Sequence, residues 1–274
     1  MARRFRQVDV FSDRIGRGNP LAVVGDAEGL SDEEMAAFAR WTNLSETTFL
    51  LTPTTPEADY RVRIFTPGGE LPFAGHPTLG TCDTWLALGG QPRGDRIVQE
   101  CGAGLVQLRR TDGRLAFAAP ALRRRELDAD ELARITGALR LPPGSVLDSQ
   151  VLDNGPTWHT LLLDSAETVL AVDRSRASTM PYEIGLVGAH TSGDADIEVR
   201  ALAYPIGVPE DPVTGSLNAS VAQWLVGEGV LPETYVAAQG TALGRAGRVY
   251  VSVDDEAAWI GGEVSAGVDG TVAL

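Results

Sequence analysis

The feature that most constrains the fold of this chain is an internal repeat between its two halves. Val62-Arg63, in the segment YRVRIFTP, matches Val199-Arg200, in IEVRALAYP, 137 positions later. Pro77, followed by Gly80-Thr81, matches Pro212, followed by Gly215-Ser216, 135 positions later. A helical stretch follows in each half and ends in a Trp-Leu pair. The distance from the proline to this pair is greater in the second half, which predicts a second helix longer by about one turn. Each half is therefore expected to be a β-rich unit wrapped around an apolar helix.

The local patterns favour an α+β fold. Residues 32 to 41 are predicted as a helix, because Ser31 and Glu34 form a capping box before an apolar periodicity. Asp128 and Glu131 open a second such helix, which ends before the Pro-Pro pair at 142 to 143. Strands are predicted, from β-branched and aromatic enrichment, at 8–11, 22–24, 48–51, 60–65, 114–117, 160–163, 197–203 and 249–253. They outnumber the helices and do not alternate regularly with them, which argues against a doubly wound sheet.

Composition excludes several classes of function. All 23 basic residues are Arg, so the chain has no lysine for a Schiff base or for a Walker-type phosphate loop. A formal net charge of −14 disfavours binding to nucleic acid or to an anionic membrane. The two cysteines are too few for a disulfide framework, the start of the sequence does not predict a signal peptide, and there is no long apolar run. We expect a cytoplasmic protein without a metal site, since the three histidines are scattered.

The two predicted helix starts have chemical significance. Backbone N–H groups and the helix dipole at an N-terminus attract anions, so the pair predicts a site for a carboxylate ligand. His76 and Asp211 each stand directly before one of the predicted helix starts, in what the repeat indicates are matching positions. Glu46 lies between a polar turn and an apolar strand, where partial burial would raise its pKa toward that of a general base. Taken alone, each residue also fits a structural role.

Five segments together resemble the phenazine-biosynthesis PhzF-like proteins, which have the diaminopimelate epimerase fold. These segments are VDVFSDRIGRGNPLAVV (8–24), NLSETTFLL (43–51), RIFTPGGELPFAGHPTLG (63–80), EDPVTGS (210–216) and QGTALGRAGRVYV (239–251). The resemblance spans nearly the whole chain in order. It implies two pseudo-symmetric domains, each a β-barrel-like sheet around a central helix. The first would comprise residues 1–118 with the last strand at about 264–274, the second would comprise 119–263, and the active site would lie in the cleft between them.

The resemblance also implies an activity and a set of site residues. The family is typified by cofactor-free isomerisation of trans-2,3-dihydro-3-hydroxyanthranilate during phenazine synthesis. By position in its motifs, Glu46 would be the acid/base, and His76 and Asp211 would assist it. Gly75, Gly215 and Ser216 would hold the substrate carboxylate or nearby polar groups. The expected protein is thus a homodimeric isomerase of a small carboxylic acid, with no cofactor and no metal.

Two other functions remain open on the sequence. One is an epimerase or racemase, although the thiol pair of the diaminopimelate epimerase branch is missing from both predicted helix starts. The other is a non-catalytic relative that binds a small ligand. Leu217-Asn218, after EDPVTGS, departs from the small residues or histidine usual in the family, and either reshapes the pocket or repacks the core. Trp158 and His159 are further candidates to line a pocket, or are part of the core.

Overall fold

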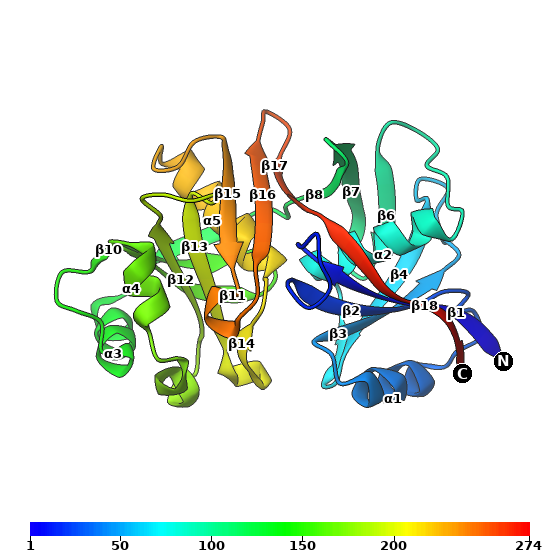
Figure 1. Cartoon of the computed structure of the whole chain (residues 1–274), viewed down its shortest axis with the longest axis horizontal. Helices are drawn as coiled ribbons and strands as arrows, with labels where there is room; N and C mark the ends of the chain where they lie inside the picture. Colours follow the sequence, from blue (N-terminus) through cyan, green and yellow to red (C-terminus); the bar gives the residue numbers. More distant parts are fainter. The chain divides into compact units, whose positions relative to one another are not determined.

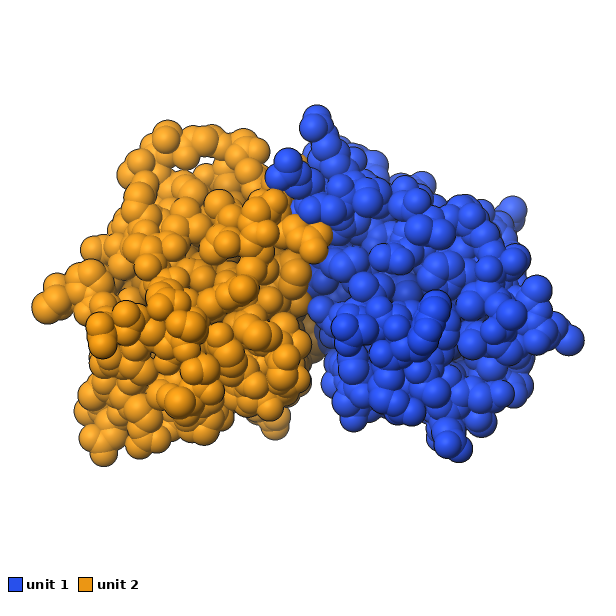
Figure 2. Space-filling view, turned by 60° about the horizontal axis from the view of Figure 1, so that its bottom comes forward, with its two compact units in different colours: residues 1–118, 261–274 blue, residues 119–260 orange.

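The computed structural model describes residues 1–274 and divides into two compact units (Figure 2). The first comprises residues 1–118 and 261–274, and the second comprises residues 119–260. Both units combine a large share of strands with few helices, so the expected α+β class is confirmed (Figure 1). None of the helices has the length and apolar content needed to span a membrane.

The first unit contains nine strands and two helices. Its strands are β1 (Ala2–Val10), β2 (Asn19–Val24), β3 (Glu46–Leu51), β4 (Tyr60–Thr66), β5 (Gly69–Leu71), β6 (Ile97–Cys101), β7 (Gly104–Thr111), β8 (Arg114–Ala118) and β18 (Val264–Ala273). Its helices are α1 (Asp32–Thr42) and α2 (Gly75–Ala87). Figure 1 shows α2 among the strands and α1 on the outside of the unit.

The second unit has the same kind of composition. Its strands are β9 (Arg123–Glu126), β10 (Val146–Asp153), β11 (Thr157–Leu163), β12 (Glu183–Ala189), β13 (Ile197–Ala203), β14 (Val208–Asp211), β15 (Thr234–Gln239), β16 (Gly247–Val253) and β17 (Ala258–Gly262), whose last two residues belong to the first unit. Its α-helices are α3 (Ala129–Leu139), α4 (Ala166–Ala171) and α5 (Gly215–Gly227). Three short 3₁₀ turns, Arg174–Thr179, Tyr204–Ile206 and Thr241–Leu243, complete it.

The strand part of the predicted repeat is confirmed by the pairing order. In the first unit β2 runs parallel to β3, β3 antiparallel to β4, and β4 parallel to β6. In the second unit β11, β12, β13 and β15 repeat this order. Register agrees as well, since Thr47 pairs with Phe65 and, 137 positions later, Ile184 pairs with Leu202.

The helix part of the predicted repeat is wrong in detail. Helices α2 and α5 begin at Gly75 and Gly215, 140 positions apart, and both have 13 residues. The offset between the helices, 140 positions, is larger than the 137 positions between the strands. The extra residues lie before the helix, because the second unit replaces the short β4–β5 turn with a 3₁₀ turn and a longer strand β14. His76 is therefore matched by Ser216, the second residue of α5, and Asp211 is the last residue of β14.

The central helices are buried because they have no polar face. Helix α2 contacts β1, β2, β3, β4, β8 and β18, and nine of its residues, from Gly75 to Thr84, are buried. A helix that is apolar or small on every side is stable only when it is enclosed on every side. By contrast, α1 and α3 are amphipathic surface helices that start with the predicted capping boxes, Ser31 with Glu34 and Asp128 with Glu131.

Each unit also holds a two-pronged Arg–Glu ion pair next to the strand that leads to its central helix. In the first unit Arg63 Nε and Nη2 donate to Glu70 at 2.7 and 2.6 Å. In the second unit Arg200 Nε and Nη2 donate to Glu210 at 2.8 and 2.9 Å. The side chains of Arg200 and Glu210 are 2% and 1% exposed, whereas those of Arg63 and Glu70 are 21% and 42% exposed.

This difference in burial predicts that loss of the glutamate charge lowers the free energy of unfolding more for the Arg200–Glu210 pair than for the Arg63–Glu70 pair. Glu210→Gln is expected to lower the free energy of unfolding by about 3–5 kcal/mol, because it leaves the guanidinium of Arg200 buried without its counter-charge. The matched change Glu70→Gln is expected to cost only about 0–1 kcal/mol, because water solvates the exposed partner. Urea denaturation of both variants measures the difference, and equal losses would contradict it.

Candidate functional site

In the first unit, the candidate residues Glu46 and His76 lie together. Glu46 is the first residue of β3, and His76 is the second residue of α2. His76 Nε2 lies 3.3 Å from Glu46 Oε2, and the two side chains are 5% and 15% exposed. The imidazole is thus nearly removed from solvent, and the carboxyl keeps a small exposed area.

Hydrogen bonds fix the strand and the helix that carry this pair. On α2, Thr81 Oγ1 donates to Thr48 Oγ1 of β3 at 2.8 Å, and both threonines are fully buried. At the other side of β3, the hydroxyls of Thr42 and Thr47 lie 2.7 Å apart, which joins the strand to the end of α1. The position of Glu46 relative to His76 therefore depends on buried polar contacts along the neighbouring residues.

The imidazole of His76 is electrically neutral near pH 7. Burial, opposed by a hydrogen bond to the backbone of Pro20, lowers the pKa of His76 to about 3. Asn19, buried at the start of β2, places its side-chain amide nitrogen 3.3 Å from His76 Nδ1. The Nδ1 side of the ring thus faces Asn19, and the Nε2 side faces Glu46. The contact is therefore between a neutral imidazole and a carboxyl group.

The lowered pKa predicts a pH dependence of stability. The unfolded chain takes up a proton on this histidine below its ordinary pKa of about 6.5, while the folded chain does not until about pH 3. The contribution of His76 to the free energy of unfolding is therefore complete above pH 6.5. It falls by up to about 1.4 kcal/mol per pH unit as the pH decreases from 6.5 toward 3. His76→Asn should show a shallower loss between pH 6.5 and 4.5 in urea denaturation. A loss of the same slope in both proteins would show that His76 is charged in the fold.

In the second unit, Asp211 ends β14 beside a tightly bonded turn. Thr214 Oγ1 donates to Asp211 Oδ2 at 2.6 Å. From β15, Gln239 Nε2 donates to Asp211 O at 3.2 Å and to Thr214 Oγ1 at 2.9 Å. Asn218 Nδ2 donates to Gln239 Oε1 at 2.8 Å and to Thr214 O at 2.9 Å. These bonds hold the turn between Asp211 and the start of α5 in one conformation.

This network accounts for the unusual Leu217-Asn218 pair. Both residues are fully buried, and Asn218 is part of the network that fixes the turn. Leu217 lies so close to Gly185 that a Cβ added there would come within 2.6 Å of its side chain. Of the two effects considered from the sequence, repacking of the interior is therefore the one that the structure supports.

Ser216 and Gly215 form the start of α5, and two other side chains orient them. Trp158 Nε1 donates to Ser216 Oγ at 3.2 Å, and Asn154 Nδ2 donates to Ser216 O at 2.9 Å. Since Oγ accepts from the indole, the hydroxyl proton of Ser216 remains available to another acceptor. Gly75 and Gly215 begin α2 and α5, where the first backbone N–H groups have no partner within the helix.

Sequence reasoning left the role of Trp158 open and missed Asn19 and Asn154. Trp158 is 3% exposed, and it acts on Ser216 instead of lining an open pocket. Its neighbour His159 belongs to a different cluster, in which its ring stacks on Tyr182 at 4.1 Å and its Nε2 lies 3.4 Å from Glu131. The alternation of side chains along a strand sends these neighbours to opposite faces. Asn19 lies within the segment 8–24 that resembles the family and Asn154 lies just before β11, but neither residue was singled out from the sequence.

The cysteines stand apart from the helix starts. Cys82 lies within α2, where it is fully buried, and burial raises the pKa of its thiol to about 12. Cys101 ends β6, and burial raises the pKa of its thiol as well. Since the thiolate is the reactive form, neither cysteine is suited to act as a base.

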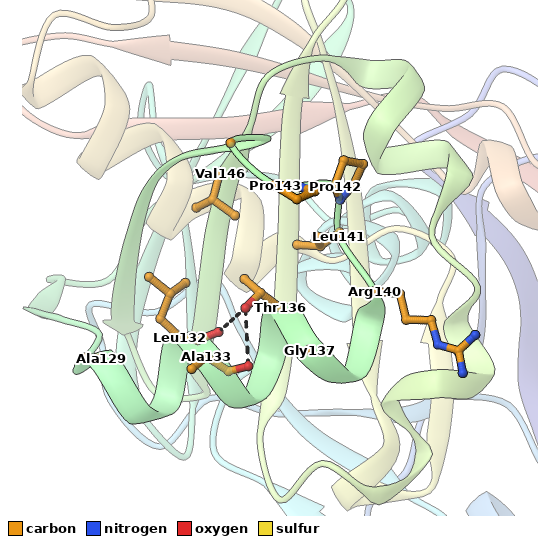
Figure 3. Close-up of a pocket in the computed structure, with 11 residues that line it drawn as sticks. Ala129, Leu132, Ala133, Thr136, Gly137, Arg140, Leu141, Pro142, Pro143 and Val146 are labelled. Atoms are coloured by element: carbon orange, nitrogen blue, oxygen red, sulfur yellow. Dashed lines mark hydrogen bonds between the residues drawn. The ribbon is translucent and has the colours of Figure 1, made fainter.

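One hollow on the surface of the second unit has no acid/base group. It has a volume of about 540 Å³ and is lined by one face of α3 and the following loop (Figure 3). Arg140 is the one ionisable residue among those that line it, and the hydroxyl of Thr136 there donates to carbonyls of its own helix, at 2.8 and 3.3 Å. The hydrogen-bonded clusters around Glu46 and Asp211 are therefore the stronger candidates for chemistry.

Comparison with known proteins decides the family. The family model for phenazine biosynthesis-like proteins, PhzC-PhzF, matches residues 8–269. The chain belongs to the PhzC-PhzF family. This confirms the resemblance that the motifs around Glu46, His76 and Asp211 indicated.

Individual PhzC-PhzF relatives align over nearly the whole chain. A Schizosaccharomyces pombe protein named antisense-enhancing sequence 1 is 36% identical, with 97% of each chain covered. The trans-2,3-dihydro-3-hydroxyanthranilate isomerase of Pseudomonas aeruginosa is 34% identical, with 92% of this chain and 90% of the relative covered. Among solved structures, a Bacillus anthracis phenazine biosynthesis protein of the PhzF family superposes with a TM-score of 0.84 at 22% identity, with both chains fully covered.

Proposed function

We propose that this protein is a cofactor-free isomerase that moves a hydrogen, and with it a double bond, within a small cyclic or conjugated amino or carboxylic acid. Isomerase activity is the reaction class of several relatives by name, including the one from Pseudomonas aeruginosa. The observation that carries the finer proposal is the 3.3 Å contact between Glu46 and the neutral His76. A cytoplasmic role in specialised metabolism, such as phenazine synthesis, is the context we propose for it.

The proposed reaction needs only proton transfer. The carboxylate of Glu46 removes a proton from an sp³ carbon, the allylic electrons shift along the conjugated system, and the same carboxyl returns the proton at the far end. Atoms and electrons balance without an oxidant or a reductant. General acid/base catalysis of this kind contributes roughly 10²–10⁴ in rate.

The other residues are proposed to bind and orient the substrate. Backbone N–H groups at Gly75 and Gly215 and the hydroxyl of Ser216 suit a carboxylate, since helix starts favour negative charge. Asp211 and His76 suit hydroxyl or amine groups and can relay a proton. For one substrate to use all of them, residues of both units must act on it together, and this is part of the proposal.

The buried, poorly acidic thiols weigh against a two-thiol racemase. The epimerase alternative without thiols predicts exchange at a stereocentre and no migration of a double bond. A ligand-binding relative without catalysis would bind the acid but turn over none of it.

The role of Glu46 predicts the effect of its isosteric replacement. Glu46→Gln is expected to lower kcat for trans-2,3-dihydro-3-hydroxyanthranilate at least 100-fold, because the amide cannot accept the proton. The loss of diene absorbance under steady-state conditions measures the rate. Glu57→Gln, a change of an exposed glutamate of the same unit, should leave kcat unchanged.

Two results would contradict this assignment. A Glu46→Gln variant with near-normal turnover would remove Glu46 from the chemistry. Equal losses in Glu46→Gln and Glu57→Gln would show a general effect of charge removal instead of a specific base.

A further inference from the structure

The two central helices begin without a side-chain cap. In α1, α3 and α4 the side chain of the residue before the helix, Ser31, Asp128 or Ser165, accepts a hydrogen bond from a backbone N–H of the first turn. Such a cap stabilises a helix start by about 1 kcal/mol. The corresponding residues of α2 and α5, Ala74 and Thr214, make no such bond. The starts of the central helices therefore depend on other contacts.

In the first unit these contacts come from a buried glutamine. Gln99, on β6, is fully buried, and its Nε2 donates to Thr78 Oγ1 on α2 at 3.0 Å. Thr78 Oγ1 in turn donates at 2.9 Å to Ala74 O, the carbonyl directly before the helix. His76 lies between Ala74 and Thr78 in this first turn. The two bonds therefore fix the backbone on both sides of His76.

The other end of the Gln99 amide is held as well. Tyr60 OH donates to Gln99 Oε1 at 3.1 Å. The Tyr60 ring stacks on Trp85, near the end of α2, with 5.1 Å between the ring centroids. Both polar ends of the buried amide thus have a hydrogen-bond partner, which offsets the cost of removing the amide from water. Gln99 therefore has a defined position from which it holds Thr78.

The second unit makes the same connection with different side chains. Asn218 is the fourth residue of α5, as Thr78 is of α2. Asn218 Nδ2 donates to Thr214 O at 2.9 Å and to Gln239 Oε1 at 2.8 Å. Strand β15 is parallel to β13 as β6 is to β4, and by register Gln239 lies two residues further along its strand than Gln99, so both side chains are on the corresponding face. Different side chains thus join the same parts of the fold, which indicates that the connection itself matters.

We propose that Gln99 is a positioning residue, which through Thr78 fixes the first turn of α2 and so holds His76 against Glu46. The inference rests on the proposed function, since it assigns Gln99 a role in that site. The side chains of His76 and Glu46 are 3.3 Å apart, and a displacement of about 1 Å between reacting groups can lower a rate about 100-fold. Without the Thr78 hydroxyl, the first turn has neither a side-chain cap nor the bond from Gln99, and the imidazole can reach water.

The test replaces two buried threonines of the same helix. Thr78→Val removes the hydroxyl that links Gln99 to Ala74, whereas Thr78→Ser retains it. Thr84→Val is the matched control, because Thr84 is also fully buried on α2 and its hydroxyl has no hydrogen-bond partner. Gln99→Met removes the donor instead of the acceptor, and it provides a second variant in case Thr78→Val does not fold.

The first readout is the charge of His76, followed by nitrogen-15 NMR of histidine-labelled protein between pH 7 and pH 5, with His76→Asn to assign the signals. In the wild type, Thr78→Ser and Thr84→Val the ring should stay neutral over this range, because burial lowers its pKa to about 3. In Thr78→Val and Gln99→Met the ring should take up a proton within this range, because an imidazole in contact with water titrates near pH 6.5. A loss of stability that leaves the first turn in place would not change this titration.

The second readout is turnover of trans-2,3-dihydro-3-hydroxyanthranilate. In Thr78→Val and Gln99→Met kcat should fall by roughly tenfold or more, whereas in Thr78→Ser and Thr84→Val it should change by less than about twofold. A wild-type titration of His76 in both Thr78→Val and Gln99→Met, or an equal change in Thr84→Val, would overturn the assignment of Gln99. The NMR titration requires no turnover, so failure of the proposed isomerase reaction would appear separately, as a wild type that does not convert this acid.

Discussion

The chemistry proposed for the first unit depends on the burial of the start of α2. A helix of small and apolar residues has no face that tolerates water, so the strands of the unit surround it. That enclosure keeps His76 neutral and holds it 3.3 Å from Glu46. A charged imidazole in the same place would form an ion pair with the carboxylate and make it a weaker base. Burial thus determines both the position of the proposed acid/base pair and its charge.

The two units carry different side chains at equivalent positions of the same fold. Where the first unit has His76, the second has Ser216, and where the first has an exposed Arg63–Glu70 pair, the second has the buried pair Arg200–Glu210. The buried pair fixes β14 directly before Asp211, and Gln239 and Asn218 fix the turn after it. This rigidity is what a set of binding groups requires, because hydrogen bonds to a ligand are strongest when their donors and acceptors do not have to be ordered first.

Local signals in the sequence predicted much of the fold but less of the site. The capping boxes at Ser31 and Asp128 were sufficient for α1 and α3, because they depend on contacts within four residues. The Val-Arg pairs predicted the strand register of the repeat, but the Pro-x-x-Gly segments gave the wrong offset, because the number of residues in a turn is not visible in a strand pattern. The contacts of Trp158 and Asn154 with Ser216 join residues about 60 positions apart, so only the folded chain brings them together.

The most direct test of the central claim is proton NMR of trans-2,3-dihydro-3-hydroxyanthranilate incubated with the protein in D₂O. If Glu46 moves a proton between two carbons, the wild type will produce double-bond migration, with deuterium on carbon to the extent that the transferred proton exchanges with D₂O, and Glu46→Gln will produce neither. An unchanged spectrum with the wild type, or the same change with both proteins, would contradict the proposal that Glu46 catalyses this hydrogen shift.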